Sequence, residues 1–169
     1  ARAVEEQIGR KLEIVSGGAT SSYTLVHWGT MPEGINHLRI GENILLGYDL
    51  PNLWHIEDMD YLRQDTFTLT AEVIEVREKP TYPQGEFCID GVRRRALLAL
   101  GRADVGELES LTPLDSGVTV VGGSSDHCIL DVTDCPRSLQ VGDTVSFALR
   151  YSHLLYLSGR EDVRQAFIR

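Results

Sequence analysis

The sequence predicts a mixed fold in which an α/β segment precedes an all-β domain. Over the first 50 residues, helical periodicity alternates with short apolar runs, which is the pattern of parallel α/β architecture. From residue 65 onward, short apolar runs recur at roughly ten-residue spacing between turn sequences, which is typical of a β-barrel or β-sandwich. We therefore expect two domains, residues 1–55 and residues 56–169.

The α/β segment is expected to run helix, strand, helix, strand. One face of a predicted helix over residues 2–12 is formed by apolar residues at steps of four, Val4, Ile8 and Leu12. The apolar run 12–15 then enters a Gly-Gly turn, and residues 21–30 read as the next helix. Residues 35–41, "INHLRIG", read as a second short buried strand. Because two parallel strands would leave exposed sheet edges, we expect the chain to be the end of a longer one.

The all-β domain is expected to begin with a long strand over residues 65–78. Its core face would hold the alternating residues Phe67, Leu69, Ala71, Val73 and Glu75. Further short strands are predicted in "RRRALLALG", "GVTVVGG", "HCILDVT" and "DTVSFALRYSHLLYL", separated by turns such as "KPTYPQGE", "LTPLDSG" and "DCPRSLQVGD". We interpret the arginine run 93–95 as a solvated strand edge.

Composition narrows the classes of function. The net charge of −9, from 16 basic and 25 acidic residues, argues against a nucleic-acid partner. No apolar run reaches the roughly 18 residues that a membrane span needs, so we expect no membrane partner. Three cysteines without CxxC spacing, Cys88, Cys128 and Cys135, predict reduced thiols that act as small buried hydrophobes in a cytoplasmic protein. The histidines show no metal-ligand spacing, so no metal site is expected.

Two stretches of the α/β segment are candidates for binding an anion. In "VSGGATSS", two glycines allow close backbone approach, and Thr20 and Ser21 supply hydroxyl and N–H groups. In "HLRIG", Arg39 interrupts an apolar run, so its guanidinium needs an acceptor, and Gly41 follows with an accessible N–H. The alternatives are an ordinary capped strand-to-helix turn and an Arg39 that pairs with a structural carboxylate. If both hold a ligand, they lie at the ends of neighbouring parallel strands, where α/β barrels bind phosphate.

Three residues of the all-β domain are candidates for contact with a substrate. Asp126 and His127 follow a glycine pair, but adjacent residues of a strand point to opposite faces and do not form a dyad easily. A structural or substrate-lining role is therefore favoured over acid–base chemistry. Arg102 could bind a carboxylate through two parallel hydrogen bonds, or it could form a surface pair with Asp104.

Taken together, these motifs resemble the pyridoxal phosphate (PLP)-dependent alanine racemases. "HLRIGENILLG" is similar to the last barrel strand, "SGGATSS" to the phosphate-binding turn and "GGSSDHCILDVTDCPRSLQVGDTVSF" to the β domain. The order of "MPEGINHLRIGE", "ALLALGR", "LTPLD" and "GGSSDH" resembles the alanine/ornithine racemase-like branch, and the resemblance covers nearly the whole chain. It implies that residues 1–55 end a (β/α)8 barrel that binds PLP, and that residues 56–169 form the β domain. It further implies an amino-acid substrate and a homodimer with shared active sites.

The resemblance also implies roles for particular residues. Arg39 would face the pyridine nitrogen of PLP, where a guanidinium weakens the electron sink and favours racemisation over side reactions. The phosphate would be surrounded by Thr20, Ser21, Gly41 and Glu42. The side of the active site that holds the substrate would be lined by three residues of the partner chain, Arg102, Asp126 and His127.

The sequence departs from the family pattern at two catalytic positions. Lys11 and Lys79 are its two lysines, and neither matches the barrel lysine that binds the cofactor covalently. Arg102, in "GRADV", takes the place of the catalytic tyrosine in "GYADG". We therefore predict that these residues alone are inactive, and ornithine, alanine, lysine and serine stay open as substrates. Two alternatives remain, a module that binds PLP or an amino acid without turnover and a β domain used for dimerisation.

Overall fold

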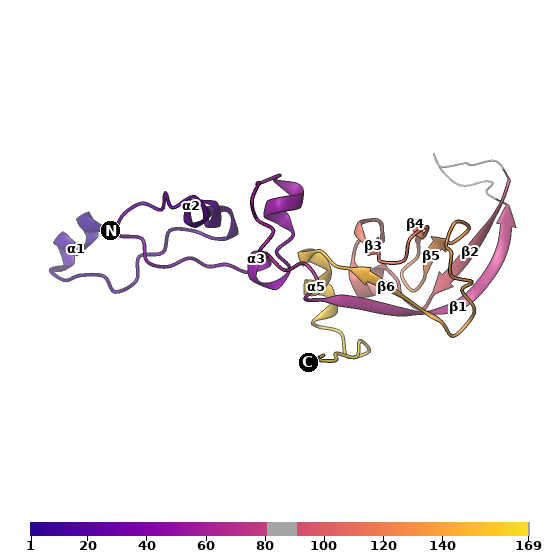
Figure 1. The fold of residues 1–169 in the computed structure, drawn as a ribbon. Helices are drawn as coiled ribbons and strands as arrows, with labels where there is room; N and C mark the ends of the chain where they lie inside the picture. The colour runs from indigo at the N-terminus through magenta and orange to yellow at the C-terminus, as the bar shows by residue number, and fades with distance from the viewer. Residues whose placement is uncertain (81–90, 169) are drawn as a thin grey trace. The chain divides into compact units, whose positions relative to one another are not determined.

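The computed structural model describes residues 1–80 and 91–168, which form two compact units, Ala1–Thr66 and Phe67–Arg169 (Figure 1). The predicted turn "KPTYPQGE" lies mostly outside the described residues, as does Cys88. No helix in the described parts is long and apolar enough to cross a membrane.

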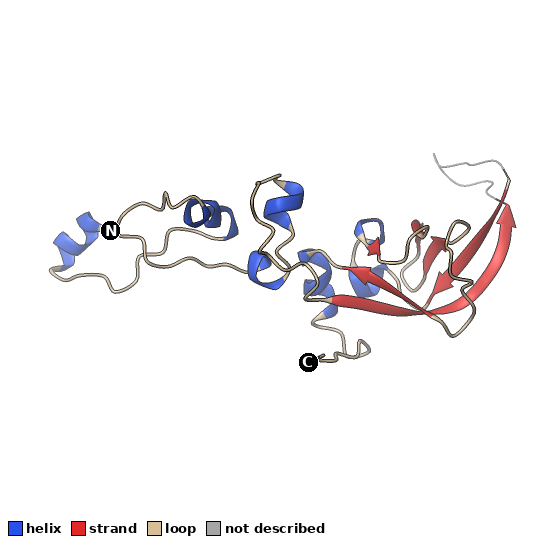
Figure 2. Cartoon of the chain, viewed as in Figure 1, coloured by secondary structure: helices blue, strands red, loops and turns tan. Residues whose placement is uncertain are grey.

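Unit 1 consists of short helices joined by extended segments (Figure 2). The helices are α1 (Arg2–Ile8), η1 (Thr20–Ser22), α2 (Tyr23–His27), α3 (Glu42–Leu45) and η2 (Asp49–Leu53). The predicted first helix is confirmed, but it ends before Leu12 because Gly9 adopts a left-handed conformation with φ of 68°. The predicted second helix is also confirmed, as η1 followed by α2.

The two predicted strands of unit 1 lie side by side and parallel, but they do not form regular strands. One parallel bridge, Ser16 to His37, is present. Three backbone hydrogen bonds connect residues 15–18 with residues 36–39: Asn36 N to Val15 O at 3.2 Å, Gly17 N to His37 O at 3.0 Å and Arg39 N to Gly18 O at 2.9 Å. This pairing places the loops that follow Gly18 and Ile40 next to each other.

Unit 2 is built on one antiparallel sheet with the strand order β3-β6-β1-β2-β5-β4. The strands are β1 (Thr68–Pro80), β2 (Val92–Leu98), β3 (Thr112–Pro113), β4 (Thr119–Gly123), β5 (Cys128–Asp131) and β6 (Thr144–Ala148). The edge strands β3 and β4 contact each other, so the sheet curls toward a closed barrel. The helices of this unit are α4 (Arg102–Val105), η3 (Leu108–Ser110) and α5 (Tyr151–Leu157).

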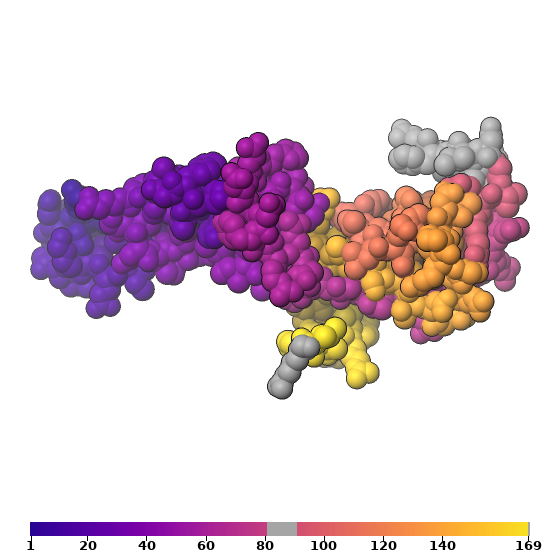
Figure 3. Space-filling model, viewed as in Figure 1, coloured from indigo at the N-terminus to yellow at the C-terminus, as the bar shows by residue number. Residues whose placement is uncertain are grey.

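The core of unit 2 follows the predicted alternation along β1. Leu69, Ala71 and Val73 are buried, whereas Phe67, just before the strand, is exposed. A register shift between Val73 and Glu75 interrupts the pairing with β2, and Glu75 is only half-buried. The inward side chains of β2, β5 and β6 complete one apolar cluster, and the space-filling view shows the residues of unit 2 in close contact on the outer surface (Figure 3).

Two predictions about unit 2 are wrong. The sequence "DTVSFALRYSHLLYL" was expected to be a single strand, but β6 ends at Ala148 and residues 151–157 form α5. His153 and Leu157 are buried four residues apart, which is helical spacing, and His153 Nδ1 accepts the Arg150 N–H at the start of the helix.

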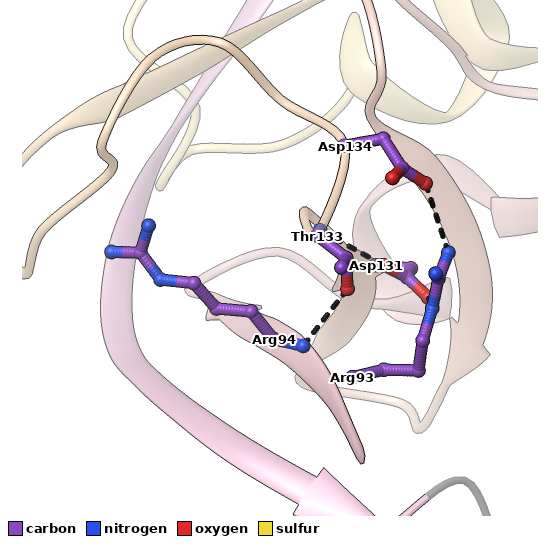
Figure 4. A network of polar contacts seen from close by, with 5 residues as sticks. All are labelled: Arg93, Arg94, Asp131, Thr133 and Asp134. Carbon is purple, nitrogen blue, oxygen red and sulfur yellow. Dashed lines mark hydrogen bonds and ion pairs between the residues drawn. The ribbon is translucent and has the colours of Figure 1, made fainter. Parts of the chain in front are cut away.

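The second wrong prediction is the solvated edge over residues 93–95. β2 is a central strand that pairs with both β1 and β5. The Arg93 guanidinium contacts Asp131 at 2.8 Å and Asp134 at 3.1 Å, and the Arg94 N–H donates to Thr133 Oγ1 (Figure 4). These acids come from β5 and the turn after it, so Arg93 is neutralised from the neighbouring strand, whereas the Arg94 guanidinium donates to Leu139 O at 2.6 Å.

Candidate functional site

The first candidate site is a turn in unit 1 that has no room for side chains at its two glycines. Gly18 has φ of +137°, and a Cβ there would lie 2.1 Å from Ser22 Oγ. A Cβ on Gly17 would lie 2.4 Å from the Ile35 side chain. The turn therefore closes tightly, with the Ser22 hydroxyl folded over the Gly18 backbone. We call residues 17–22 the cradle.

Hydroxyl groups surround the end of the cradle. The Ser22 N–H donates to Ala19 O at 3.0 Å, and Thr24 Oγ1 donates to Ser21 O at 3.0 Å, so the turn continues directly into α2. Thr20 is half-buried and Ser21 is exposed. Hydroxyls and backbone N–H groups at such a turn are suitable donors for an anionic oxygen.

Arg39 lies beside the cradle because its N–H donates to Gly18 O at 2.9 Å. Its side chain is exposed rather than buried in the apolar run, so the expected burial is wrong. Among the described residues, the structure gives its guanidinium no hydrogen-bond or ion-pair partner, and the alternative of a pair with a structural carboxylate is not found there. A cation and a turn rich in donors therefore lie together on neighbouring segments, as the sequence predicted.

Glu42 uses its carboxylate within its own loop. Oε1 accepts the N–H groups of Tyr48 at 2.8 Å and Asp49 at 3.1 Å. Burial raises the pKa of the Glu42 carboxyl above its ordinary value, although these two hydrogen bonds oppose the shift. The side chain thus shapes the loop after Gly41, which leaves Gly41 and the Glu42 backbone as the groups of this loop that could face a ligand.

The second candidate site lies in unit 2, where the loop of residues 124–127 packs against the start of α4. A Cβ on Gly101 would lie 1.9 Å from Ser125 O, and Arg102 N donates to Ser124 O at 3.0 Å. Asp126 is exposed, and its Oδ2 accepts the Ser125 hydroxyl at 2.8 Å. His127 is exposed, and no hydrogen bond joins it to Asp126 among the described residues. The structure brings Arg102 and this loop together, and it shows no Asp–His dyad in the part of the chain that it describes.

Arg102 pairs with Glu109, not with Asp104, the alternative partner considered from the sequence. Its Nη1 donates to Glu109 Oε2 at 2.9 Å, and its Nη2 donates to Oε1. The hydrogen bond from Arg102 lowers the pKa of the Glu109 carboxyl, which keeps it ionised. Sequence reasoning missed Glu109, because it lies seven residues away across a turn at Gly106 and carries no pattern of its own. Asp104 instead accepts the Gly101 N–H at 2.8 Å.

The described residues hold no group of three or more His, Cys, Asp or Glu side chains arranged to bind a metal. His153 was assigned no role from the sequence, yet it is fully buried in unit 2 and hydrogen-bonded at both ring nitrogens.

The chain is similar to two characterised racemases. It is 45% identical over 163 residues to the lysine racemase of Thermotoga maritima, which covers 90% of this chain and 45% of that protein. It is 40% identical over 156 residues to the ornithine racemase of Acetoanaerobium sticklandii, covering 86% of this chain and 43% of that protein. The chain thus spans less than half the length of these relatives. No protein-family model matches it.

Solved structures show the same fold at low sequence identity. The alanine racemase of Oenococcus oeni aligns with 93% of this chain and 47% of its own, with a TM-score of 0.58 and 17% identity. The D-threonine aldolase of Filomicrobium marinum aligns with 89% of this chain and 37% of its own, with a TM-score of 0.61 and 17% identity. The predicted fold class is confirmed, and so is the resemblance to amino-acid racemases.

Proposed function

We propose that this chain is the C-terminal portion of a PLP-dependent racemase that interconverts the L and D forms of an amino acid. The observation that carries the proposal is the 45% and 40% identity to a lysine and an ornithine racemase over nearly the whole chain. Of the four substrates left open by the sequence, these relatives favour the two with a side-chain ammonium group. Similarity of fold alone would not decide the reaction, because an aldolase and racemases share it.

The cradle and Arg39 fit PLP. The tightly closed Gly17–Gly18 turn lets the backbone approach a phosphate, for which Thr20 and Ser21 supply hydroxyls and Gly41 and Glu42 supply backbone N–H groups. The exposed Arg39 guanidinium is a donor for the pyridine nitrogen. When bound, PLP withdraws electrons from the α-carbon of an amino acid and so makes its α-proton easier to remove.

The substrate side is assigned to Arg102, Asp126 and His127 of the β domain. Glu109 accepts from both terminal nitrogens of Arg102, so this arginine acts as one half of an ion pair rather than as a free receptor for the substrate carboxylate. Asp126 is held by Ser125 Oγ and keeps Oδ1 for a polar group of the substrate. We propose that the protein is a cytoplasmic homodimer in which these side chains reach the cofactor of the partner chain.

Residues 1–169 alone are expected to be inactive. The Lys11 ammonium lies 3.6 Å from the Glu5 carboxylate, and the Lys79 ammonium lies 2.8 Å from the Glu75 carboxylate. Neither lysine belongs to the cradle or to its neighbouring segment. Racemisation therefore requires a lysine from a segment other than these residues.

The test is α-proton exchange by the complete polypeptide that contains these residues. The purified protein would be incubated in deuterium oxide with PLP and, separately, with lysine, ornithine, alanine and serine. Deuterium at the α-carbon and loss of optical activity with lysine or ornithine are the expected results. If PLP binds, as seen from its absorption spectrum, but no amino acid exchanges, racemisation is refuted.

Two observations favour a second candidate, a protein that binds PLP or an amino acid without turnover. Arg102, which by the family resemblance takes the place of the catalytic tyrosine, is engaged by Glu109, and both lysines are engaged elsewhere. In the same experiment this candidate predicts cofactor or amino-acid binding with no exchange.

A further inference from the structure

Helix α5 contacts the segment of residues 101–110 at several points. The Tyr156 ring covers Gly106 so closely that a Cβ there would lie 2.5 Å from Tyr156 Cε2. His153 Nε2 lies 3.0 Å from Glu107 O and 2.9 Å from Ser110 Oγ. Just after the helix, the Arg160 guanidinium contacts the Asp104 carboxylate at 3.1 Å. These contacts fix the backbone of the segment along most of its length.

The same segment carries both members of the Arg102–Glu109 pair. Arg102 begins α4, and Glu109 lies in η3, between the two groups that contact His153, Glu107 O and Ser110 Oγ. Both side chains of the pair are about half exposed, so surrounding side chains do not hold them rigidly. The distance between them therefore depends on the backbone that α5 supports.

The hydrogen bonds of His153 identify which ring nitrogen supports the segment. Nδ1 accepts the Arg150 N–H at 2.9 Å, so the proton of the neutral ring is on Nε2, which donates to Glu107 O. A second proton, on Nδ1, would place an N–H donor of the ring opposite the N–H donor of Arg150. The charged groups that face the ring are Arg150, at the start of α5, and Glu107, before η3. Burial, the largest effect, lowers the pKa of the His153 imidazole, and the Arg150 charge adds to this while Glu107 opposes it.

We propose that His153 is a positioning residue whose neutral imidazole holds the Arg102–Glu109 pair in the geometry that the substrate requires. This inference rests on the proposed function, because it assigns a use to the substrate side of the same site. His153 acts through the backbone of residues 107–110 and does not touch the substrate. A second proton on the ring would remove the acceptor of the Arg150 N–H but leave Nε2–H as the donor to Glu107 O, so the support of residues 107–110 depends on Nε2.

Two substitutions in the complete protein separate the two ring nitrogens. His153→Gln places an amide donor near the position of Nε2, so it keeps the contact with Glu107 and loses the one with Arg150. His153→Asn places an acceptor near the position of Nδ1 and keeps only the contact with Arg150. We expect kcat/KM to fall about tenfold or more in His153→Asn and to change about threefold or less in His153→Gln. Ser158→Ala, at the exposed end of α5, is the matched control.

Rescue of activity by the conservative variant provides the readout that a merely structural role would not change. His153→Gln keeps a donor for Glu107 O and lacks the acceptor for the Arg150 N–H, so its kcat/KM should stay near that of the natural protein while that of His153→Asn falls. Equal losses of activity in both variants would overturn the proposal.

Hydrogen exchange separates this proposal from the proposed function. In His153→Asn, the amides of residues 101–110 should exchange about tenfold faster or more, whereas His153→Gln and Ser158→Ala should leave them protected. If the natural protein shows no α-proton exchange, the proposed function fails, and faster amide exchange in His153→Asn alone would still show the support by α5. Unchanged protection of residues 101–110 in His153→Asn would refute that support.

Discussion

Gly18 combines a positive φ with a close neighbour, and both exclude a side chain. A Cβ would meet Ser22 Oγ at 2.1 Å in a backbone conformation that L-residues rarely adopt. We predict that Gly18→Ala costs about 1–3 kcal/mol locally and weakens PLP binding in the complete protein. Titration of the cofactor, followed by its absorption spectrum, measures the change in affinity.

Gly34→Ala is the matched control for Gly18→Ala. Gly34 also has a positive φ, of +89°, but nothing lies within 4 Å of a Cβ placed there. Gly34→Ala introduces backbone strain without a clash, so the affinity for PLP should stay close to that of the natural protein. Equal weakening by both substitutions would mean that the cradle does not contact the phosphate.

Arg39 is exposed and lies next to the cradle, so its replacement should affect chemistry more than folding. We predict that Arg39→Gln slows α-proton exchange about tenfold or more, because a neutral amide replaces a permanent cation beside the cofactor. The temperature of unfolding should hardly change. Arg2→Gln, at an exposed position of α1, serves as the control. Equal exchange rates in both variants would contradict the role given to Arg39.

At the scale of elements, the contacts between β2 and the turn after β5 give a pH-dependent prediction. Burial alone would raise the pKa of the Asp131 carboxyl, but the Thr133 N–H and the Arg93 guanidinium together lower it (Figure 4). An acid with a lowered pKa in the folded state stabilises the protein above its unfolded pKa of about 4, and this contribution is lost as the pH falls below that value.

We therefore predict that Asp131→Asn costs about 1–3 kcal/mol of unfolding free energy at neutral pH and that this difference shrinks below about pH 4. Asp134→Asn is the control, because Asp134 contacts the same arginine but its side chain is 71% exposed, and its loss should cost about 0.5 kcal/mol or less. Denaturant titrations at several pH values measure both. Equal losses of unfolding free energy in the two variants would show that the contact between Arg93 and Asp131 does not stabilise the protein.

The elements differ in how far the sequence alone could predict them. The alternation in residues 65–78 predicts β1 because one buried face dictates a period of two. The helix α5 was missed because "SHLLYL" continues an apolar strand, and the hydrogen bond from the Arg150 N–H to His153 Nδ1 at its start carries no signal in the sequence. In the site, the glycines of the cradle carry a signal in the sequence. Glu109 carries none, because its pairing with Arg102 depends on how the chain turns at Gly106.

At the scale of the whole molecule, the two units have very different cores. The buried hydrophobic residues of unit 1 are Leu46, Leu50 and Met59, whereas a continuous cluster drawn from all the longer strands fills unit 2. In unit 1, large apolar side chains such as Trp28, Ile44 and Trp54 are exposed. Apolar burial is the main favourable term in folding, so unit 2 is the part that can be stable on its own.

We predict that residues 67–169 unfold cooperatively when expressed alone and that residues 1–66 do not. Thermal unfolding followed by circular dichroism distinguishes the two, with the 169-residue chain as the reference. A cooperative transition in residues 1–66 would contradict the prediction, as would its absence in residues 67–169.

The strand order of unit 2 has a consequence for how the protein is made. β1 leaves the ribosome first, yet one of its two partners is β6, whose pairing joins Leu69 to Phe147 across most of the domain. Until β6 is synthesised, one edge of β1 is unpaired and its apolar face is exposed. Nascent chains in this state aggregate or recruit chaperones. The yield of soluble protein should therefore depend on how quickly translation proceeds from residue 80 to residue 148, even when no amino acid is changed.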